Sequence, residues 1–372
     1  MPDGELISVT INDGIKKFSE LGRHDNSNDD KSKYKKVCIG DIAYNSMRMW
    51  QGASGYSPYE GIVSPAYTVL SPNSNIYSKC VAYQFKLPQT IHIFQINSQG
   101  ITSDNWNLKY PALSKIKINV SRSLEEQRLI AEFFTHLDRL ITLHQRKYDK
   151  LTKVKKAMLE KMFPENGSPY PEIRFKGFTD AWEQRKFSEL TEIRSASRVH
   201  KEEWQSSGVP FYRSSDVMAA LNGTENEKAF ISEELYEKLS AVSGKLEKGD
   251  ILVTGGGSVG KPYIVPNNEP LYTKDADLLW VKNNEKLVPY FIYTFFFSPA
   301  FSDYLNSVSH VGTIAHYTIT QLEETPITLP CVSEQQKIGD YFRNIDSLIT
   351  LHQRKLEKLK NIKKACLEKM FV

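Results

Sequence analysis

The chain contains the stretch EEQRLIAEFFTHLDRLITLHQRKYDKLTKVKKAMLEKMF at positions 125–163 and a near copy, SEQQKIGDYFRNIDSLITLHQRKLEKLKNIKKACLEKMF, at positions 333–371. The second copy begins 208 positions after the first (333 minus 125) and aligns with it without a gap. About three-fifths of the aligned residues are identical, including the block ITLHQRK. Further upstream, Gly40-Asp41-Ile42 matches Gly249-Asp250-Ile251 at an offset of 209. The chain is therefore an internal repeat, in which each half is a variable region followed by a nearly identical one.

Both copies have the apolar periodicity of a long helix. Their apolar residues recur with alternating spacings of four and three, which is typical of a coiled-coil seam. A helix of roughly 40 residues is about 60 Å long, far more than a small domain needs as a cap. Because the two helices are repeat-related, we expect them to pair antiparallel. The predicted seam consists of Ile130, Phe134, Leu137, Ile141, His144, Tyr148 and Leu151 in the first helix and Ile338, Phe342, Ile345, Ile349, His352, Leu356 and Leu359 in the second.

An alternative interpretation is that each helix only covers its own domain, but that does not account for the matched lengths. His144 and His352 lie on the seam, where we expect packed or hydrogen-bonded histidines that loosen the coil locally, and not metal ligands. The lysines between positions 150 and 161 are expected to form a solvated helix face, with nucleic-acid or protein binding as their second role.

The variable regions alternate short β segments with helices. GDILVT, KPYIVP and DADLLWV in the second region, and GDIAYNSM and GIVSPAYTVL in the first, are separated by Gly, Pro and Asn turns. PENGSPYP, which follows Phe163, ends the first long helix. The predicted class is α+β: two tandem α/β domains separated by two long helices that form an antiparallel coiled coil. The expected division is 1–122 for the first domain, 123–163 for the first helix, 164–171 for a linker, 172–332 for the second domain and 333–372 for the second helix.

Composition limits the class of protein. The 40% hydrophobic and 25% charged residues are typical of a soluble globular chain. There is no run of about 18 apolar residues and no signal-like N-terminus, so we expect a cytoplasmic protein without a membrane partner. The four cysteines lie far apart with no C-x-x-C pair, which favours reduced thiols over a metal site. A net charge of +4 permits nucleic-acid binding without requiring it.

The sequence offers little support for catalysis. GGGSVGKP at 255–262 resembles a phosphate-binding loop, but Pro262 stands where that loop has a hydroxyl residue, and the sequence continues as a strand where a helix should begin. A phosphate-transfer enzyme built on this segment is therefore the third hypothesis. No dinucleotide-binding fingerprint, no N-P-P-[YF] methyltransferase tetrapeptide and no H-E-x-x-H occurs. Any active sites associated with this chain are expected on other chains.

The order of segments resembles the specificity subunit of type I restriction-modification systems. Each variable region ends in a glycine-containing turn, a short apolar strand and an E-Q pair before the long helix, as in QGITSDNWNLKYPALSKIKINVSRSLEEQRLI at 99–130 and VGTIAHYTITQLEETPITLPCVSEQQKI at 311–338. GFTDAWEQRKFSEL at 177–190 resembles the usual opening of such a recognition domain. The resemblance covers essentially the whole chain, and order, spacing and duplication agree.

This resemblance implies a non-catalytic subunit with two target recognition domains, each of which grips one half of a split DNA site. The paired helices would act as a ruler, and two methyltransferase subunits and restriction subunits would assemble on the chain. It also implies no cofactor in this chain, with S-adenosylmethionine, ATP and magnesium on the partner subunits. One departure is that only 39 residues precede the first GDI, whereas 72 lie between Gly177 and Gly249, so we expect a first domain truncated at its N-terminus by about 30 to 40 residues.

Base readout favours polar loop residues, with Lys and Arg on phosphates. The predicted DNA-binding residues are Tyr44, Asn45, Arg48, Trp50, Gln51 and Thr102 in the first domain and Arg213, Ser214, Thr254, Ser258, Lys261, Lys274 and Thr313 in the second. The alternative function is a coiled-coil scaffold or interaction protein that does not read DNA, which salt-sensitive binding to duplex DNA would exclude.

Overall fold

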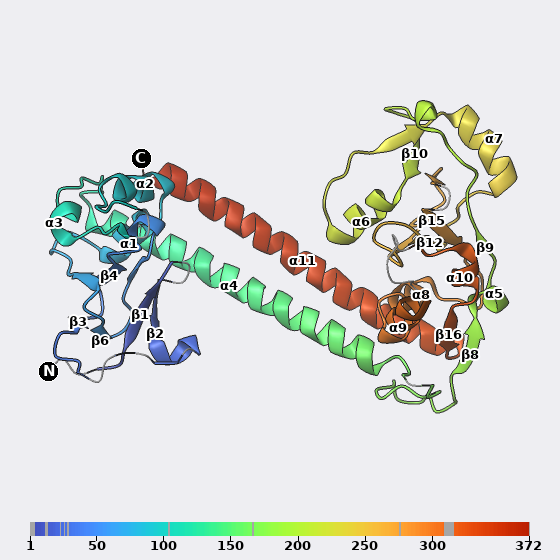
Figure 1. Ribbon diagram of the computed structural model, residues 1–372, viewed down its shortest axis with the longest axis horizontal. Coiled ribbons are helices and arrows are strands. Elements are labelled where there is room, and N and C mark those ends of the chain that lie inside the picture. The colour runs from blue at the N-terminus through green and yellow to red at the C-terminus, as the bar shows by residue number, and fades with distance from the viewer. Residues whose placement is uncertain are drawn as a thin grey trace. The chain divides into compact units, whose positions relative to one another are not determined.

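The computed structural model of the chain describes residues 4–11, 14–22, 24–25, 27, 30–102, 105–165, 167–274, 277–308 and 316–371. These residues form two compact units (Figure 1). The first unit contains Met1–Gln145 together with Arg354–Val372, and the second contains Arg146–Gln353. The boundary between the units therefore falls inside both long helices.

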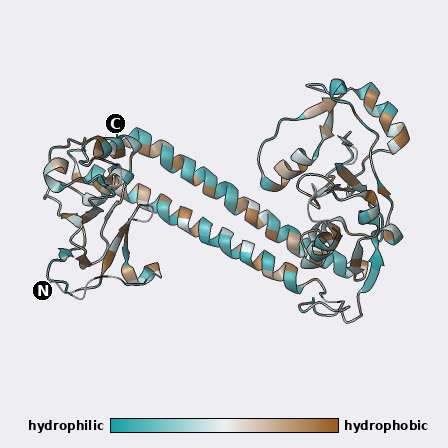
Figure 2. Cartoon of the chain, in the orientation of Figure 1, coloured by the Kyte–Doolittle hydropathy of each residue, from teal (hydrophilic) through white to brown (hydrophobic). Residues whose placement is uncertain are grey.

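The two long helices are α4 (Leu124–Lys161) and α11 (Val332–Met370), which confirms the prediction of two long helices. Glutamates occupy the first turn of each helix and lysine the last, which complements the helix dipole. The Ser123 hydroxyl accepts a hydrogen bond from the Glu126 N–H at 3.3 Å and so caps the start of α4. Figure 2 shows hydrophobic bands that recur along both helices between hydrophilic ones.

In each unit, the parts of α4 and α11 that belong to it run antiparallel. In the first unit, the beginning of α4 packs on the end of α11, where the rings of Phe134 and Phe371 stack with centroids 5.9 Å apart. In the second unit, the end of α4 meets the beginning of α11, where the centroids of Phe163 and Phe342 lie 6.4 Å apart. This is the pairing expected of a repeat-related coiled coil.

All fourteen predicted seam residues are buried or half-buried, and none is exposed. Ile130, Phe134, Leu137, Ile338, Phe342, Ile345 and Leu356 are buried. The middle of each seam, including Ile141 and Ile349, is only half-buried, because there a helix has little besides the other helix to cover it.

The first unit is built on an antiparallel sheet in the order β5-β4-β7, with β1 paired to β2 and β3 to β6. Helix α1 covers this sheet and shares a core with Tyr44 and Phe94. Its elements are β1 (Ile7–Thr10), β2 (Gly14–Lys17), η1 (Phe18–Leu21), β3 (Lys35–Val37), β4 (Ile42–Asn45), η2 (Met49–Gln51), β5 (Ser54–Tyr56), β6 (Gly61–Val63), β7 (Tyr67–Leu70), α1 (Ser78–Gln84), α2 (Pro88–Ile96) and α3 (Tyr110–Leu113).

The second unit contains a four-stranded antiparallel sheet in the order β13-β12-β15-β9, a sheet in the order β11-β10-β14, and the pair β16-β8. An aromatic core, with Phe291 and Phe295 at its centre, joins α8 to the ends of both long helices. The elements are β8 (Glu183–Lys186), α5 (Phe187–Leu190), β9 (Ile193–Arg194), η4 (Lys201–Glu203), β10 (Val209–Tyr212), α6 (Ser214–Asn222), β11 (Ala229–Ile231), α7 (Glu233–Ser243), β12 (Ile251–Thr254), β13 (Pro262–Ile264), β14 (Tyr272–Thr273), β15 (Leu278–Val281), α8 (Pro289–Phe295), α9 (Pro299–Val308), α10 (Ile319–Glu323) and β16 (Pro326–Leu329).

The units repeat one another in their central sheets. Strand β4 lies between β5 and β7 as β12 lies between β13 and β15, and a helix beginning with proline follows at α2 and α9. The matched Gly-Asp-Ile triplets lead into β4 and β12. Gly40 and Gly249 have positive φ angles of 99° and 91°, and each following aspartate accepts the N–H of the residue three positions before it. The predicted α+β duplication is therefore confirmed, and the repeat marks the turn that starts each central strand.

Candidate nucleic-acid interface

The predicted DNA-binding residues of the first unit gather on two adjoining loops. Asn45 is the last residue of β4, and Arg48 and Gln51 lie on the connection from β4 to β5. Trp50, on the same connection, packs edge-on against Trp106, with ring centroids 5.2 Å apart. Trp106 belongs to the second loop, whose ends are held by mutual backbone hydrogen bonds between Gln99 and Asn107. This arrangement brings the loop that carries Thr102 against the β4–β5 connection.

Cationic and apolar side chains both face solvent on these loops. Arg48 is exposed and donates to the Gln51 amide oxygen at 3.2 Å, so its guanidinium lies at the surface. Ile101 is 99% exposed and Met47 is also exposed, although neither was predicted. These side chains are accessible to solvent beside the exposed guanidinium of Arg48.

The burial of Tyr44 contradicts the prediction that this residue binds DNA. Its side chain is 0% exposed and belongs to the core beneath the β5-β4-β7 sheet. The reason is strand alternation: Tyr44 is the third residue of β4, and its side chain points into the core on the same face as Ile42. Tyr44 is therefore a packing residue and is withdrawn from the DNA-binding set.

In the second unit, Ser214, Lys274 and the start of the glycine-rich loop at 255–260 all contact Asp277, which lies between β14 and β15. The Ser214 hydroxyl donates to the Asp277 carbonyl at 3.0 Å, and the Gly255 N–H donates to the same carbonyl at 2.8 Å. Lys274 forms an ion pair with the Asp277 carboxylate. Ser258 is exposed on the glycine-rich loop. These groups come from the start of α6, the loop after β14 and the loop after β12.

His316 and Asp277 are the residues of this cluster that sequence reasoning missed. A Cβ atom on Gly256 would lie 3.1 Å from the Asp277 carboxylate and 3.7 Å from the His316 ring. The Tyr317 N–H, next in the chain, donates to the Gly255 carbonyl at 2.7 Å. Asp277 and His316 belong to loops far apart in the sequence, so no local motif marks them.

Three other predicted residues of the second unit are engaged inside the unit. Arg213 pairs with Asp216 at 3.0 Å, and its guanidinium lies 5.4 Å from the ring centroid of Trp204. Thr254 is buried, and its hydroxyl accepts the Lys261 N–H at 2.8 Å, so it is also withdrawn. The Lys261 ammonium lies 5.8 Å from the ring centroid of Phe297, and not beside the Asp277 group. Thr313 lies outside the described residues.

The segment GGGSVGKP forms a β-hairpin turn between β12 and β13, and not a phosphate-binding loop. The two strands pair antiparallel, with Val253 opposite Pro262, and the residues directly after Lys261 form strand β13 where a phosphate-binding loop would begin a helix. Gly260 has φ of 74°, and a Cβ there would lie 2.8 Å from the ring of Phe301. Tight packing therefore explains this glycine, and the third hypothesis loses its structural basis.

Two repeat-equivalent ion pairs connect α4 and α11, one in each unit. Asp138 binds Lys363 at 2.5 Å in the first unit, and Lys155 binds Asp346 at 2.6 Å in the second. Both members of the second pair differ from those of the first by 208 positions (346 minus 138 and 363 minus 155). The repeat symmetry of the coiled coil therefore extends to its polar contacts.

A tyrosine hydroxyl completes each of these ion pairs. Tyr83 donates to Asp138 at 2.8 Å, and Tyr290 donates to Asp346 at 2.9 Å. Burial raises the pKa of both phenols, so each hydroxyl stays protonated and acts as a donor. Each cluster therefore connects the rest of its unit to the parts of α4 and α11 that belong to that unit.

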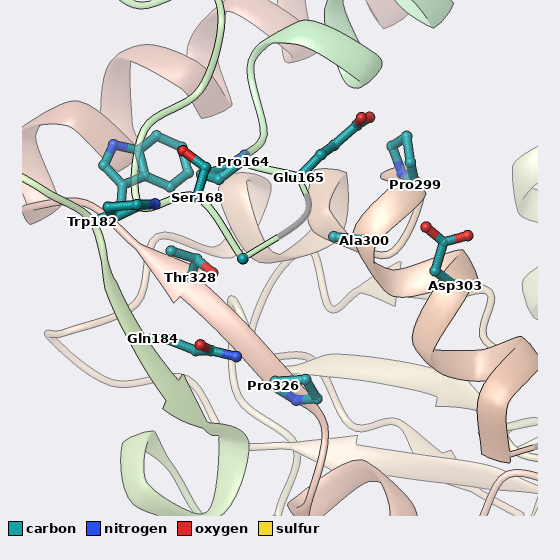
Figure 3. Close-up of a pocket in the computed structure, with 12 residues that line it drawn as sticks. Pro164, Glu165, Ser168, Trp182, Gln184, Pro299, Ala300, Asp303, Pro326 and Thr328 are labelled. Carbon is teal, nitrogen blue, oxygen red and sulfur yellow. The ribbon is translucent and has the colours of Figure 1, made fainter.

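A cavity of about 430 Å³ lies in the second unit beside β8 and β16 (Figure 3). Pro164, Ser168 and Trp182 stand on one side of it and Ala300 and Asp303 on the other (Figure 3). None of the predicted DNA-binding residues lines it. The cavity is therefore separate from the candidate interface.

Within the described ranges, no group of three or more His, Cys, Asp or Glu side chains is placed to hold a metal ion. Among the helices that the structure describes, none is both long and apolar enough to cross a membrane.

The chain matches the family model of the type I restriction modification DNA specificity domain over residues 10–153 and 179–361. It is 24% identical over 349 residues to the specificity subunit of the type I restriction enzyme MjaVIII of Methanocaldococcus jannaschii, an alignment that covers 90% of this chain and 80% of that one. Its fold is similar to the S subunit of the type I restriction-modification system of M. genitalium, with a TM-score of 0.63 and 14% identity over 100% of this chain and 90% of that chain. A second similar fold, from work on complex assembly and conformational transition of the type I R-M system, has a TM-score of 0.50 and 16% identity over 99% of this chain and 91% of that one.

The family match spans both repeat halves, and the duplicated fold agrees with it. This chain is therefore a member of the family of type I restriction-modification DNA specificity subunits.

Proposed function

We propose that this chain recognises a two-part DNA sequence and positions methyltransferase and restriction subunits on it. The observation that carries the proposal is the internal duplication of this chain, whose two halves both match the family model. The two units have the same central strand arrangement, and each carries a cluster of polar and cationic residues on loops. Two equivalent surfaces suit a DNA site with two half-sites, as protein symmetry is mirrored in the spacing of half-sites. We assign 1–122 and 172–332 as the target recognition domains, 164–171 as a linker, and 123–163 and 333–372 as spacer helices.

The candidate contacts divide by chemistry. Arg48 and Lys274 are suited to phosphates or guanine edges, and Asn45, Gln51, Thr102, Ser214 and Ser258 to base edges. In this proposal the helix pair would keep the two surfaces a fixed distance apart and so set the number of uncontacted base pairs, at about 3.4 Å per pair.

In this proposal the chain has no catalytic role of its own and works in the cytoplasm. Methylation and cleavage belong to the methyltransferase and restriction subunits, which bind S-adenosylmethionine, ATP and magnesium. The broken phosphate-binding motif at 255–262, which forms a hairpin, supports this division.

Mapping methylated adenines across the genome tests the proposal, with and without this gene, in cells that carry the partner subunits. We expect one bipartite motif to lose methylation when the gene is removed. Partner assembly that persists while no motif depends on the gene would favour the scaffold alternative.

Purified complexes give a second test. Arg48→Ala should weaken binding to the cognate duplex, and if Arg48 contacts a phosphate it should lower the slope of log K against log salt by about one. Arg139→Ala is the matched control, because Arg139 is exposed on α4 in the same unit. Equal affinity and salt slope for the Arg48 variant and the wild type would remove Arg48 from the interface.

A further inference from the structure

The beginning of α11 in the second unit is covered by the segment Glu172–Leu190. Arg174 donates two hydrogen bonds to the Glu334 carboxylate, at 2.7 and 2.8 Å, and Glu334 is 0% exposed. Two turns further along the same face of α11, Phe175 packs edge-on against Tyr341, with ring centroids 6.1 Å apart. The segment therefore supplies a cation and an aromatic ring to two positions of the repeated helix.

The same segment then adds a strand and two large rings. Strand β8 pairs antiparallel with β16, from Glu183 opposite Leu329 to Lys186 opposite Pro326. Figure 3 shows Gln184 on β8 beside Thr328 and Pro326 on β16, with Trp182 before the strand. The Trp182 ring lies 6.2 Å from Phe163 between centroids, at the end of α4. Strand β8 therefore pairs with the edge of β16, and Trp182 covers the end of α4.

The repeat-equivalent positions of the first unit are uncovered. Glu126, the equivalent of Glu334, is exposed and accepts a hydrogen bond from the Ser121 hydroxyl in place of an arginine. Phe133, the equivalent of Tyr341, is 40% exposed. Met370 is 39% exposed, whereas its equivalent Met162 is 3% exposed. All three positions correspond to those that lie against 172–190, or next to its tryptophan, in the second unit. Identical or similar residues thus differ in burial: they are covered by 172–190 in the second unit and exposed in the first.

The segment that corresponds to β16 also lacks a partner among the described strands, although the Asn119 carbonyl accepts a hydrogen bond from the Gln84 side chain at 2.7 Å. Residues 117–120 correspond to β16 at the offset of 209 that also relates the Gly-Asp-Ile triplets. Ile118 and Val120 pack half-buried against the core of the first unit, whereas Lys117 and Asn119 are exposed, which is the alternation of a strand. Among the strands that the structure describes, none pairs with 117–120. Such an edge is a template for a further strand.

We propose that this face of the first unit is a docking site for an extended segment of another polypeptide with the chemistry of Ile173–Phe187. Its arginine would pair with Glu126, its first aromatic residue would cover Phe133, and its strand would run antiparallel beside 117–120. Its tryptophan would cover the end of α11 at Phe371. Charge complementarity at Glu126 and the filled equivalent face in the second unit argue for this occupant, and the inference does not depend on DNA binding.

A peptide of residues 172–190 of this chain, labelled with fluorescein, is the probe, and fluorescence anisotropy with the full chain is the measurement. We expect saturable binding of one peptide per chain. Glu126→Arg should weaken binding about tenfold or more, because it replaces a charge-assisted hydrogen bond with repulsion. A peptide with Arg174→Glu should bind the wild type weakly and the Glu126→Arg chain more tightly. Glu160→Arg, an exposed position of α4, is the control and should leave the affinity unchanged.

Hydrogen exchange locates the bound peptide. We expect amide protection at 117–120 when the peptide is added. Protection at 326–329 instead, or equal affinity for the wild type and the Glu126→Arg chain, would mean exchange with the chain's own segment and would overturn the proposal. Absence of saturable binding, or self-association of the chain that the peptide does not displace, would overturn it too.

Discussion

Lengthening both spacer helices by one heptad should lengthen the gap between the two half-sites and leave the half-sites themselves unchanged. The cleanest change is a tandem duplication of Gln145–Leu151 together with Gln353–Leu359, whose sequences are QRKYDKL and QRKLEKL. Each duplicated heptad lies between the two ion-pair positions of its helix and repeats the native seam spacing.

The size of the effect follows from helix geometry. Seven residues at about 1.5 Å each add about 10.5 Å. At about 3.4 Å per base pair, this is about three additional uncontacted base pairs. The paired change also preserves the register. In an antiparallel helix pair, residues that lie opposite one another have position numbers with a constant sum. This sum is 501 for Asp138 and Lys363 and also for Lys155 and Asp346, and one added heptad in each helix raises both sums equally.

Methylation mapping of the double-duplication complex is the assay. The expected result is the same two half-sites separated by about three more base pairs. Duplicating Gln145–Leu151 alone is the control, because it shifts one helix against the other by seven residues, so that the two ion pairs no longer share one register and activity should fall. An active double variant that still methylates the original spacing would refute the ruler and leave the helices a packing role only.

Three further outcomes are expected. Ile141→Asn combined with Ile349→Asn should lower the free energy of unfolding by about 2 kcal/mol, since each half-buried side chain contributes about 1 kcal/mol, as thermal melting would show. Glu334→Ala should cost about 3 kcal/mol because it leaves the half-buried guanidinium of its partner unpaired, whereas Glu126→Ala should change stability by less than about 0.5 kcal/mol in the same melting assay. Burial raises the pKa of the Cys80 thiol to about 11, so iodoacetamide at pH 8 should modify Cys80 slowest in the folded chain, as peptide mass spectrometry would report.

Neighbouring positions supply the controls. Leu140 and Leu348 are exposed beside the seam, so changing both to asparagine is the control. If this control lowers the stability as much as the Ile141 and Ile349 double variant does, the predicted pairing is contradicted. Cys38 and Cys331 are exposed and should react first. Rapid modification of Cys80 under native conditions would show that the part of the first unit around this residue unfolds locally with little cost in free energy.

Features that depend on local pattern were predictable. The heptad spacing places both long helices within a few residues of their observed ends, and the repeated Gly-Asp-Ile triplet marks a turn whose geometry needs a glycine with positive φ. Proline in place of a hydroxyl residue at position 262 correctly argues against a phosphate-binding loop, because the residues around it form strands.

Features that depend on contacts between distant segments were not predictable from the sequence. Glu126 and Glu334 stand in nearly the same local sequence, yet only the second is buried, because a segment about 160 residues earlier in the chain carries the arginine that neutralises it. Tyr44 follows polar-loop logic in the sequence, but strand alternation turns its ring into the core. The group around Asp277 joins three loops, so no motif within one stretch marks it. Which loop residues read bases stays a prediction.

The division of the helices between the units has a consequence for biosynthesis. The second unit is one continuous stretch, 146–353, so all of its residues have been synthesised before the last part of α11 is added. The first unit needs the last nineteen residues of the chain, including the ring of Phe371 that stacks on Phe134. The domain that is translated first is therefore completed last, and a stop codon within the final turns of α11 should injure the amino-terminal domain, more than 200 residues away in sequence.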